Sequence, residues 1–194
     1  MKTTLLMAGA AFAALSAASF SASALDVDGS ASKVSLISTK VLADGTSSVA
    51  EMFSFNSLGG QVAEDGTATV TIELGEIETG IDIRNERMGE YFFKTDQYPQ
   101  AMITAQIPDG ATDTGIRAID LDIELNLHGN QASYTVPVVV SSDDNGVSVV
   151  ASEPVLINAN SFELQGGLGK LAELAGLMHI PATVPVTFSL AFTR

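Results

Sequence analysis

The chain has 194 residues, no cysteine and a formal net charge of −14. The absence of cysteine excludes disulfides, thiol catalysis and thiolate metal sites. The acidic balance argues against nucleic acid and anionic membrane surfaces as partners, because both attract clustered lysine and arginine.

The N-terminus has the layout of a secretory signal peptide. Lys2 precedes an apolar run over residues 5–15, and Ala22-Ser23-Ala24 has the A-x-A form of a cleavage site. Spanning a bilayer takes about 20 apolar residues, and here serines interrupt the run. We therefore expect residues 1–24 to be a cleaved signal peptide and residues 25–194 to form one exported domain. No later apolar run is long enough to span a membrane, so stable membrane insertion is not expected.

Most of the chain from residue 33 onward alternates between apolar and polar residues, which is the period of a half-buried β-strand. The longest pattern covers residues 119–127, where a row of carboxylates opposes the apolar face and must contact water. Asp144-Asn145-Gly146 predicts a hairpin with a type I′ turn. The other predicted strands cover residues 33–38, 49–55, 67–74, 101–107, 134–140, 147–151, 155–157 and 183–193.

Two segments have a helical period instead. In residues 83–93, Arg84, Met88 and Tyr91 share one face. In residues 168–177, apolar side chains recur at i, i+3, i+4 and i+7. About eight antiparallel strands with one or two short helices predict an all-β domain, and alternation alone leaves both a sandwich and a closed barrel open.

The sequence offers little support for catalysis or metal binding. The two histidines, His128 and His179, lie far apart and do not have the spacing of a zinc site. No G-x-S-x-G motif is present, and the glycines of residues 166–169 lack the spacing of a phosphate-binding loop. We therefore expect no enzyme, no catalytic residue, no metal and no cofactor other than a bound lipid.

The segment Gly80–Pro99 concentrates arginine, carboxylate and aromatic side chains. One interpretation is an amphiphile site, in which an aromatic wall takes the tail and an arginine binds an anionic or carbonyl head. The other is a helix that closes a barrel end, in which Arg87 pairs with Glu90, and Arg84 pairs with an aspartate at position 82 or 96. Methionine and aromatic residues at helical spacing favour the second interpretation.

The sequence resembles the YceI-like family, also called polyisoprenoid-binding proteins, in several motifs that occur in order along the chain. The resemblance extends over essentially the whole of residues 25–194. Its most specific parts are the D-I-R-N-E-R-M segment and the L-x-L-H-G strand end. The motifs are Ser38-Thr39-Lys40, Phe55-Asn56-Ser57-Leu58-Gly59-Gly60, Thr79-Gly80-Ile81-Asp82-Ile83-Arg84-Asn85-Glu86-Arg87-Met88, Phe92-Phe93, Tyr98-Pro99, Leu125-Asn126-Leu127-His128-Gly129 and Val184-Pro185-Val186-Thr187-Phe188.

The resemblance implies a lipocalin-like antiparallel β-barrel with an elongated apolar cavity for an isoprenoid or similar chain. It also implies a periplasmic location in a Gram-negative bacterium, a non-catalytic role in carrying isoprenoid quinones or other lipids, links to stress responses, and the occurrence of homodimers. Gly89 departs from the family pattern, and glycine inside a helix costs about 1 kcal/mol against alanine. The helix is therefore expected to be short or kinked.

The expected function is binding or transport of a long apolar amphiphile, such as a polyisoprenoid, an isoprenoid quinone or a fatty-acid-like lipid. The alternative is a structural or stress-response interaction protein with a filled barrel, and an enzyme acting on bound lipid comes third. The expected ligand-binding residues are Phe53, Phe55, Val70, Ile72, Arg84, Arg87, Met88, Tyr91, Phe92, His128 and Phe188, with Arg84, Arg87 and His128 near the head group.

Overall fold

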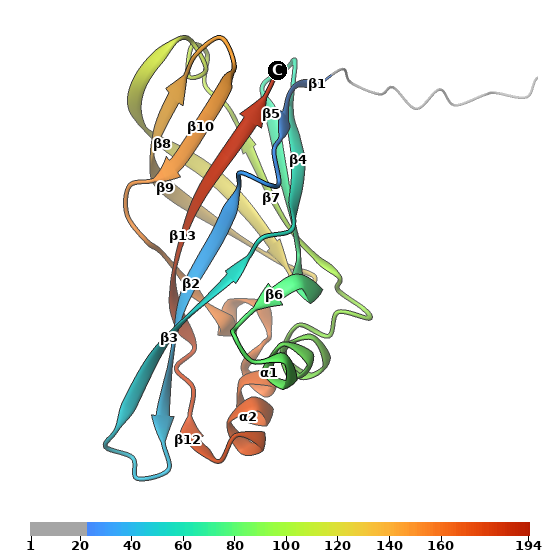
Figure 1. The fold of residues 1–194 in the computed structure, drawn as a ribbon, viewed down its shortest axis with the longest axis vertical. Coiled ribbons are helices and arrows are strands. Elements are labelled where there is room, and N and C mark those ends of the chain that lie inside the picture. Colours follow the sequence, from blue (N-terminus) through green and yellow to red (C-terminus); the bar gives the residue numbers. More distant parts are fainter. Residues whose placement is uncertain (1–22) are drawn as a thin grey trace, which may run out of the picture.

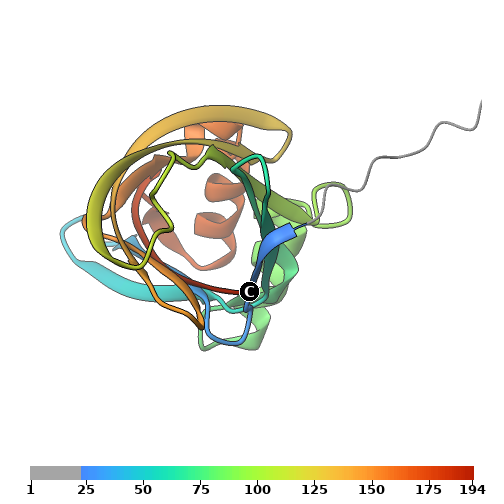
Figure 2. The ribbon, with the colours of Figure 1, turned by 90° about the horizontal axis from the view of Figure 1, so that it is seen from above.

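The computed structural model describes residues 23–194, which form an antiparallel barrel with short helices gathered at one end (Figure 1). Seen along the barrel, the strands make a ring and α2 (Gln165–Leu174) lies across its far end (Figure 2). The expected signal peptide, residues 1–24, lies outside the described residues except for Ser23 and Ala24, which begin the first strand.

Thirteen strands and five helical segments make up the described chain. The strands are β1 (Ser23–Val27), β2 (Lys33–Leu42), β3 (Ser48–Phe55), β4 (Leu58–Ala63), β5 (Thr67–Glu73), β6 (Ile77–Glu78), β7 (Gln100–Gln106), β8 (Gly115–Leu127), β9 (Asn130–Ser142), β10 (Gly146–Ala151), β11 (Val155–Asn158), β12 (Leu177–His179) and β13 (Thr183–Thr193). The helical segments are η1 (Leu74–Glu76), α1 (Asp82–Arg87), η2 (Met88–Phe93), η3 (Ala159–Phe162) and α2.

Eight strands close the ring in the order β1-β4-β5-β7-β8-β9-β10-β13, and β1 pairs with β13 to complete it. The strand β13 is long enough to pair with β11 and β10 along one edge and with β2 and β1 along the other. As a result β2 continues the line of β1, and β11 continues the line of β10. This continuation carries the barrel wall toward the helices.

The antiparallel barrel confirms the predicted fold class and decides between the two architectures that alternation left open. The row Asp120, Asp122 and Glu124 is exposed, as predicted. The β9–β10 hairpin also forms, but its predicted type I′ turn is wrong, because neither Asn145 nor Gly146 has a positive φ. Instead the Asp143 carboxylate accepts hydrogen bonds from the backbone N–H groups of both residues, at 2.8 and 3.2 Å.

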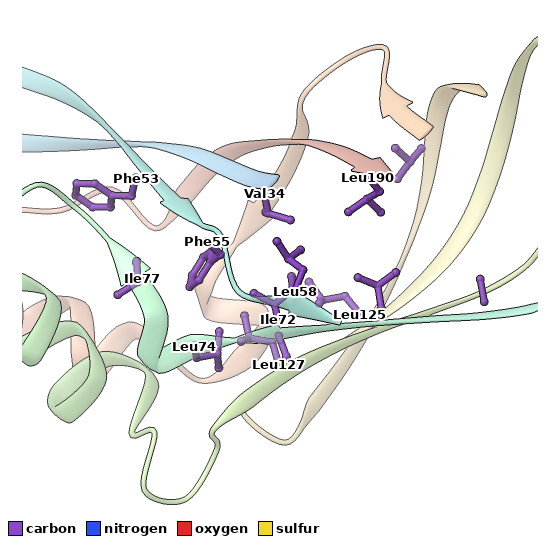
Figure 3. Packing of buried hydrophobic residues seen from close by; sticks show 14 of the residues in the cluster. Val34, Phe53, Phe55, Leu58, Ile72, Leu74, Ile77, Leu125, Leu127 and Leu190 are labelled. Carbon is purple, nitrogen blue, oxygen red and sulfur yellow. The ribbon is translucent and has the colours of Figure 1, made fainter. Parts of the chain in front are cut away.

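The apolar core is formed by the inward-facing residues, which occupy every second position along the strands. Val34 and Leu190 point across the barrel toward side chains from β5 and β8, among them Ile72 and Leu125 (Figure 3). Period-two alternation therefore marks the inner wall of the barrel. Within residues 23–194, no helix combines the length and the hydrophobicity needed to cross a bilayer.

Candidate functional site

A cavity of about 550 Å³ occupies the half of the barrel interior nearest the helices. Its volume lies within the range of about 300–1,000 Å³ that is usual for small-molecule sites. All but five of its lining side chains are apolar, and they come from the strands, from α1 with η2, and from α2. The five polar or charged lining residues are Ser38, Lys40, Glu51, Arg84 and Arg87.

The polar lining residues gather at one end of the cavity. The strand register pairs Ser38 with Glu51, so both lie at the same height of the β2–β3 hairpin. Glu51 Oε2 accepts from Lys40 Nζ at 2.9 Å and from Arg84 Nη1 at 2.8 Å. We refer to Lys40, Glu51 and Arg84 as the charged triad. It links the hairpin to α1 at the mouth of an otherwise apolar space.

Arg84 is the most constrained of the three side chains. Its Nη2 donates to the Thr79 carbonyl at 2.6 Å, and its guanidinium carbon lies 4.7 Å from the centroid of the Phe53 ring. Its Nε is buried and has no partner among the described residues. A buried N–H without an acceptor is costly, so the described residues leave one donor of the Arg84 guanidinium unsatisfied beside the cavity that Arg84 lines.

The prediction that Arg84 pairs with an aspartate of its own helical segment is wrong. Arg84 pairs with Glu51 from a strand distant in sequence, and not with an aspartate of its own segment. Among residues 23–194 no ion pair joins Arg87 to Glu90 either. Of the charged side chains in this segment, Arg84 and Arg87 line the cavity, and the partner of Arg84 could not be inferred from spacing along one helix.

The charged triad makes stability depend on pH in a defined direction. Burial raises the pKa of the Glu51 carboxyl, but hydrogen bonds and charge from Lys40 and Arg84 outweigh this, so its pKa lies below the ordinary 4.5. The ionised form thus stabilises the fold above pH 4.5, and this stabilisation is lost as pH falls through the lower, folded-state value. We expect E51Q to be less stable than the natural protein at neutral pH and the difference to shrink below pH 4.5, measured by urea unfolding.

A turn carboxylate provides the control for that titration. Hydrogen bonds from the side chain and backbone of Ser47 and from the backbone of Thr46 lower the pKa of Asp44 to about 2. The difference in unfolding free energy between D44N and the natural protein should therefore persist to lower pH than the corresponding difference for E51Q. The role of the triad would be contradicted if the difference in unfolding free energy between E51Q and the natural protein stayed constant as pH falls below 4.5.

The helix of residues 82–93 changes its winding in the middle. After α1 the chain continues as a π-helix in η2, with i→i+5 hydrogen bonding, and Lys94 ends it in the left-handed conformation. This break occurs at Met88 and Gly89, where a short or kinked helix was expected. The wider turn brings Met88 and Phe93, five residues apart, onto the buried side. The prediction that Tyr91 shares the face of Met88 is wrong for the same reason.

The second helical wall depends on a glycine. Helix α2 packs against η2 so closely that a Cβ on Gly167 would lie 2.7 Å from the Tyr91 carbonyl oxygen and 2.8 Å from Phe92 Cα. By contrast, a Cβ on Gly169, in the same helix, would meet nothing within 4 Å. Of these two glycines, only Gly167 therefore has a steric role.

These two glycines give a matched pair of substitutions. G167A should destabilise the protein by about 1–3 kcal/mol, because two backbones must separate. G169A should stabilise it by up to about 1 kcal/mol through helix propensity. Urea unfolding of both variants measures the difference, and equal midpoints would contradict the close packing of α2 on η2.

Most of the residues expected from the sequence to contact ligand do line this cavity: Phe53, Phe55, Ile72, Arg84, Arg87, Met88, Phe92 and Phe188. Val70 lines a second, smaller cavity, and Tyr91 and His128 line neither. His128 follows the end of β8 with a φ of 53° and packs against Tyr98 in a tilted arrangement, with ring centroids 4.3 Å apart. Its Nδ1 lies 3.2 Å from the Phe162 carbonyl oxygen, so the ring is held outside the cavity wall.

Sequence reasoning missed the contribution of α2 and the strands around it. Among the lining residues not expected are Leu164, Leu168, Leu171, Leu177 and Ile180. The apolar face of residues 168–177 was visible in the sequence, but nothing there indicated that it covers a cavity. Glu51 was visible too, as the residue that breaks the apolar parity of β3.

Comparison with known proteins places the chain in a family. The model of the YceI-like domain matches residues 17–192. A solved polyisoprenoid binding domain from Saccharophagus degradans, described as implicated in plant cell wall breakdown, is 31% identical, with 89% of this chain and 99% of that chain covered and a TM-score of 0.83. No curated protein matches the chain.

Two further structures share the fold at lower identity. BcnA of Burkholderia cenocepacia is 22% identical, with a TM-score of 0.64 over 85% of this chain and 98% of that chain. A YCEI protein of Campylobacter jejuni is 12% identical, with a TM-score of 0.52 over 73% of this chain and 84% of that chain. The match of the domain model over nearly the whole chain, on a barrel that encloses an apolar cavity, shows that the protein belongs to the YceI-like family.

Proposed function

We propose that the protein is a non-enzymatic carrier that holds the tail of a long amphiphile, such as a polyisoprenoid, an isoprenoid quinone or a fatty-acid-like lipid, inside the barrel. The observation that carries this proposal is the 550 Å³ cavity, which is apolar along its walls and charged at one end. Burying apolar surface stabilises by roughly 25 cal/mol per Å², so such a space favours a hydrocarbon chain over water. The polyisoprenoid binding domain from Saccharophagus degradans supports the same ligand class.

The Arg84 guanidinium, which lines the large cavity, supports placing the head group at the charged triad. A carbonyl, hydroxyl or phosphate oxygen of the ligand would accept its hydrogen bond. The tail would then lie against Phe53, Phe55, Ile72 and Phe92, which line the wall beyond. His128 is left out of this assignment because its ring lies against Tyr98, outside the cavity.

The two alternative functions have weaker support. A barrel with a filled interior does not agree with a cavity of this volume. The notion of an enzyme acting on bound lipid rested on His128 beside a carboxylate inside the cavity, and the His128 ring instead contacts the Phe162 carbonyl outside it. We also propose that residues 1–24 direct the chain to the periplasm, where a carrier shields apolar lipid from water.

Native mass spectrometry of the protein purified from its own host tests this function. We expect a mass increment that solvent extraction removes and identifies as a lipid. The same spectra show whether the chain is a monomer or the homodimer that the family resemblance implies. A protein without bound lipid, and without a saturable site for an apolar dye, would overturn the proposal.

A further inference from the structure

A second cavity of about 80 Å³ occupies the other half of the barrel interior, away from the helices. Its lining is apolar apart from Thr112 and includes Leu25 of β1, Val147 of β10 and Phe192 of β13. These residues come from the end of the barrel where β1 and the C-terminus lie (Figure 1). The interior is therefore divided into a large compartment that reaches the charged triad and a small compartment beyond it.

Four side chains line both compartments and so lie between them: Val34, Phe188, Ile103 and Ile123. We refer to them as the dividing ring. Val34 and Phe188 are direct partners in the pairing of β2 with β13. Ile103 of β7 and Ile123 of β8 lie on neighbouring paired strands.

The topology places these two pairs on opposite walls. Around the ring of eight strands, β7 is four places from β13, and β8 is four places from β1, whose line β2 continues. Strands four places apart in an eight-membered ring face each other across the interior. The four side chains therefore meet from both sides of the barrel.

The dividing ring also lies at a fixed depth below the charged triad. Both Lys40 and Val34 belong to β2 and face inward, and six residues of extended chain correspond to about 20 Å. A ligand with its head at the triad would reach Val34 and Phe188 with the far part of its tail.

We propose that the dividing ring sets the length of the ligand tail that the protein binds, an inference that rests on the proposed carrier function. A tail that ends at the ring buries all of its methylene groups. A longer tail has to displace these four side chains or leave its excess outside in water, and in either case the additional carbons add no affinity. The chain thus selects amphiphiles by tail length through residues remote from the head group.

Competition binding with a series of isoprenoid alcohols tests the proposal. Geraniol, farnesol, geranylgeraniol and solanesol differ in the number of isoprene units, and each would displace an apolar naphthylamine dye. For the natural protein we expect affinity to rise along the series and then level off. For F188A the rise should continue for at least one further member, with binding of that member roughly tenfold tighter, because burial of two more methylene groups suffices for this gain.

The chain offers a matched control and a second opening variant. Phe192 is also an inward-facing phenylalanine of β13, but it lines the small compartment alone, so F192A should leave the levelling point unchanged. I103A opens the dividing ring from the opposite wall and should move the levelling point in the same direction as F188A. Circular dichroism and unfolding midpoints show whether each variant folds. If either F188A or I103A does not fold, the remaining one tests the proposal.

The possible results separate this proposal from the proposed function. If the natural protein binds neither the dye nor any of the alcohols, both the carrier function and the length selection are overturned. The length selection alone is overturned if the affinity of the natural protein rises along the whole series without levelling off. It is also overturned if the affinity of the folded variants F188A and I103A levels off at the same alcohol as that of the natural protein.

Discussion

Replacing Val186 with tryptophan is expected to abolish lipid binding while the barrel stays folded. Val186 faces the cavity from β13, where it pairs with Leu36 on one side and Val155 on the other. The indole would fill space that a tail otherwise occupies. Loss of burial for four methylene groups at about 0.8 kcal/mol each weakens binding by about a hundredfold or more. Dye displacement by geranylgeraniol measures the loss.

The neighbouring residue provides the control. Thr187 is exposed on the outer face of the same strand, so T187W adds the same side chain without entering the cavity. The natural chain contains no tryptophan, and each variant therefore carries a single fluorophore. We expect blue-shifted emission and lost binding for V186W, and red-shifted emission with unchanged binding for T187W. Full binding by a V186W protein with buried, blue-shifted emission would contradict the assignment of this cavity as the lipid site.

The largest expected loss of stability follows replacement of Phe162 with alanine. Its side chain is fully buried, with 0% exposed, and it lines neither cavity. Phe162 belongs to η3, which packs against β9. The backbone carbonyl oxygen of Phe162 lies 3.2 Å from His128 Nδ1. Truncation leaves a void in packed core, so the free energy of unfolding should fall by about 3–5 kcal/mol. Urea unfolding measures the change.

Another phenylalanine tests whether packing causes that loss. Phe92 is half-buried and borders the large cavity, so its truncation enlarges an existing space. F92A should therefore cost clearly less stability than F162A, while weakening lipid binding more. If both variants lost the same stability, the distinction between packed core and cavity wall would be wrong.

Much of the barrel could be predicted because each strand carries its own signal. The alternation in residues 119–127 describes one dry and one wet face, and a barrel wall requires no more than that. The strand β4 was missed because Gly59 and Gly60 interrupt its alternation. The structure explains this: Gly60 has a φ of +133°, and a Cβ there would lie 2.0 Å from the Thr69 carbonyl oxygen.

The site was less predictable than the fold because its charged contacts join distant segments. Arg84 and Glu51 are 33 residues apart, and only the position of α1 beside the β2–β3 hairpin brings them to 2.8 Å. The face of η2 was misjudged because spacing rules assume an α-helix, whereas the chain changes to a π-helix at Met88. Ligand contact by Tyr91 and His128 stays a prediction, although neither side chain borders the cavity.

By itself the sequence determined the all-β class, the inward face of most strands, the two helical segments and the family resemblance, since these depend on local period and on motifs. The resemblance implied a barrel with a cavity, but tertiary structure alone decided which strands close the ring, how large the unfilled space is, and that a charged triad and a dividing ring lie at opposite ends of it. The physical reason is that closure depends on pairing between β1 and β13, at the two ends of the described chain. The volume of a cavity likewise depends on how facing walls are separated, and local sequence does not specify this.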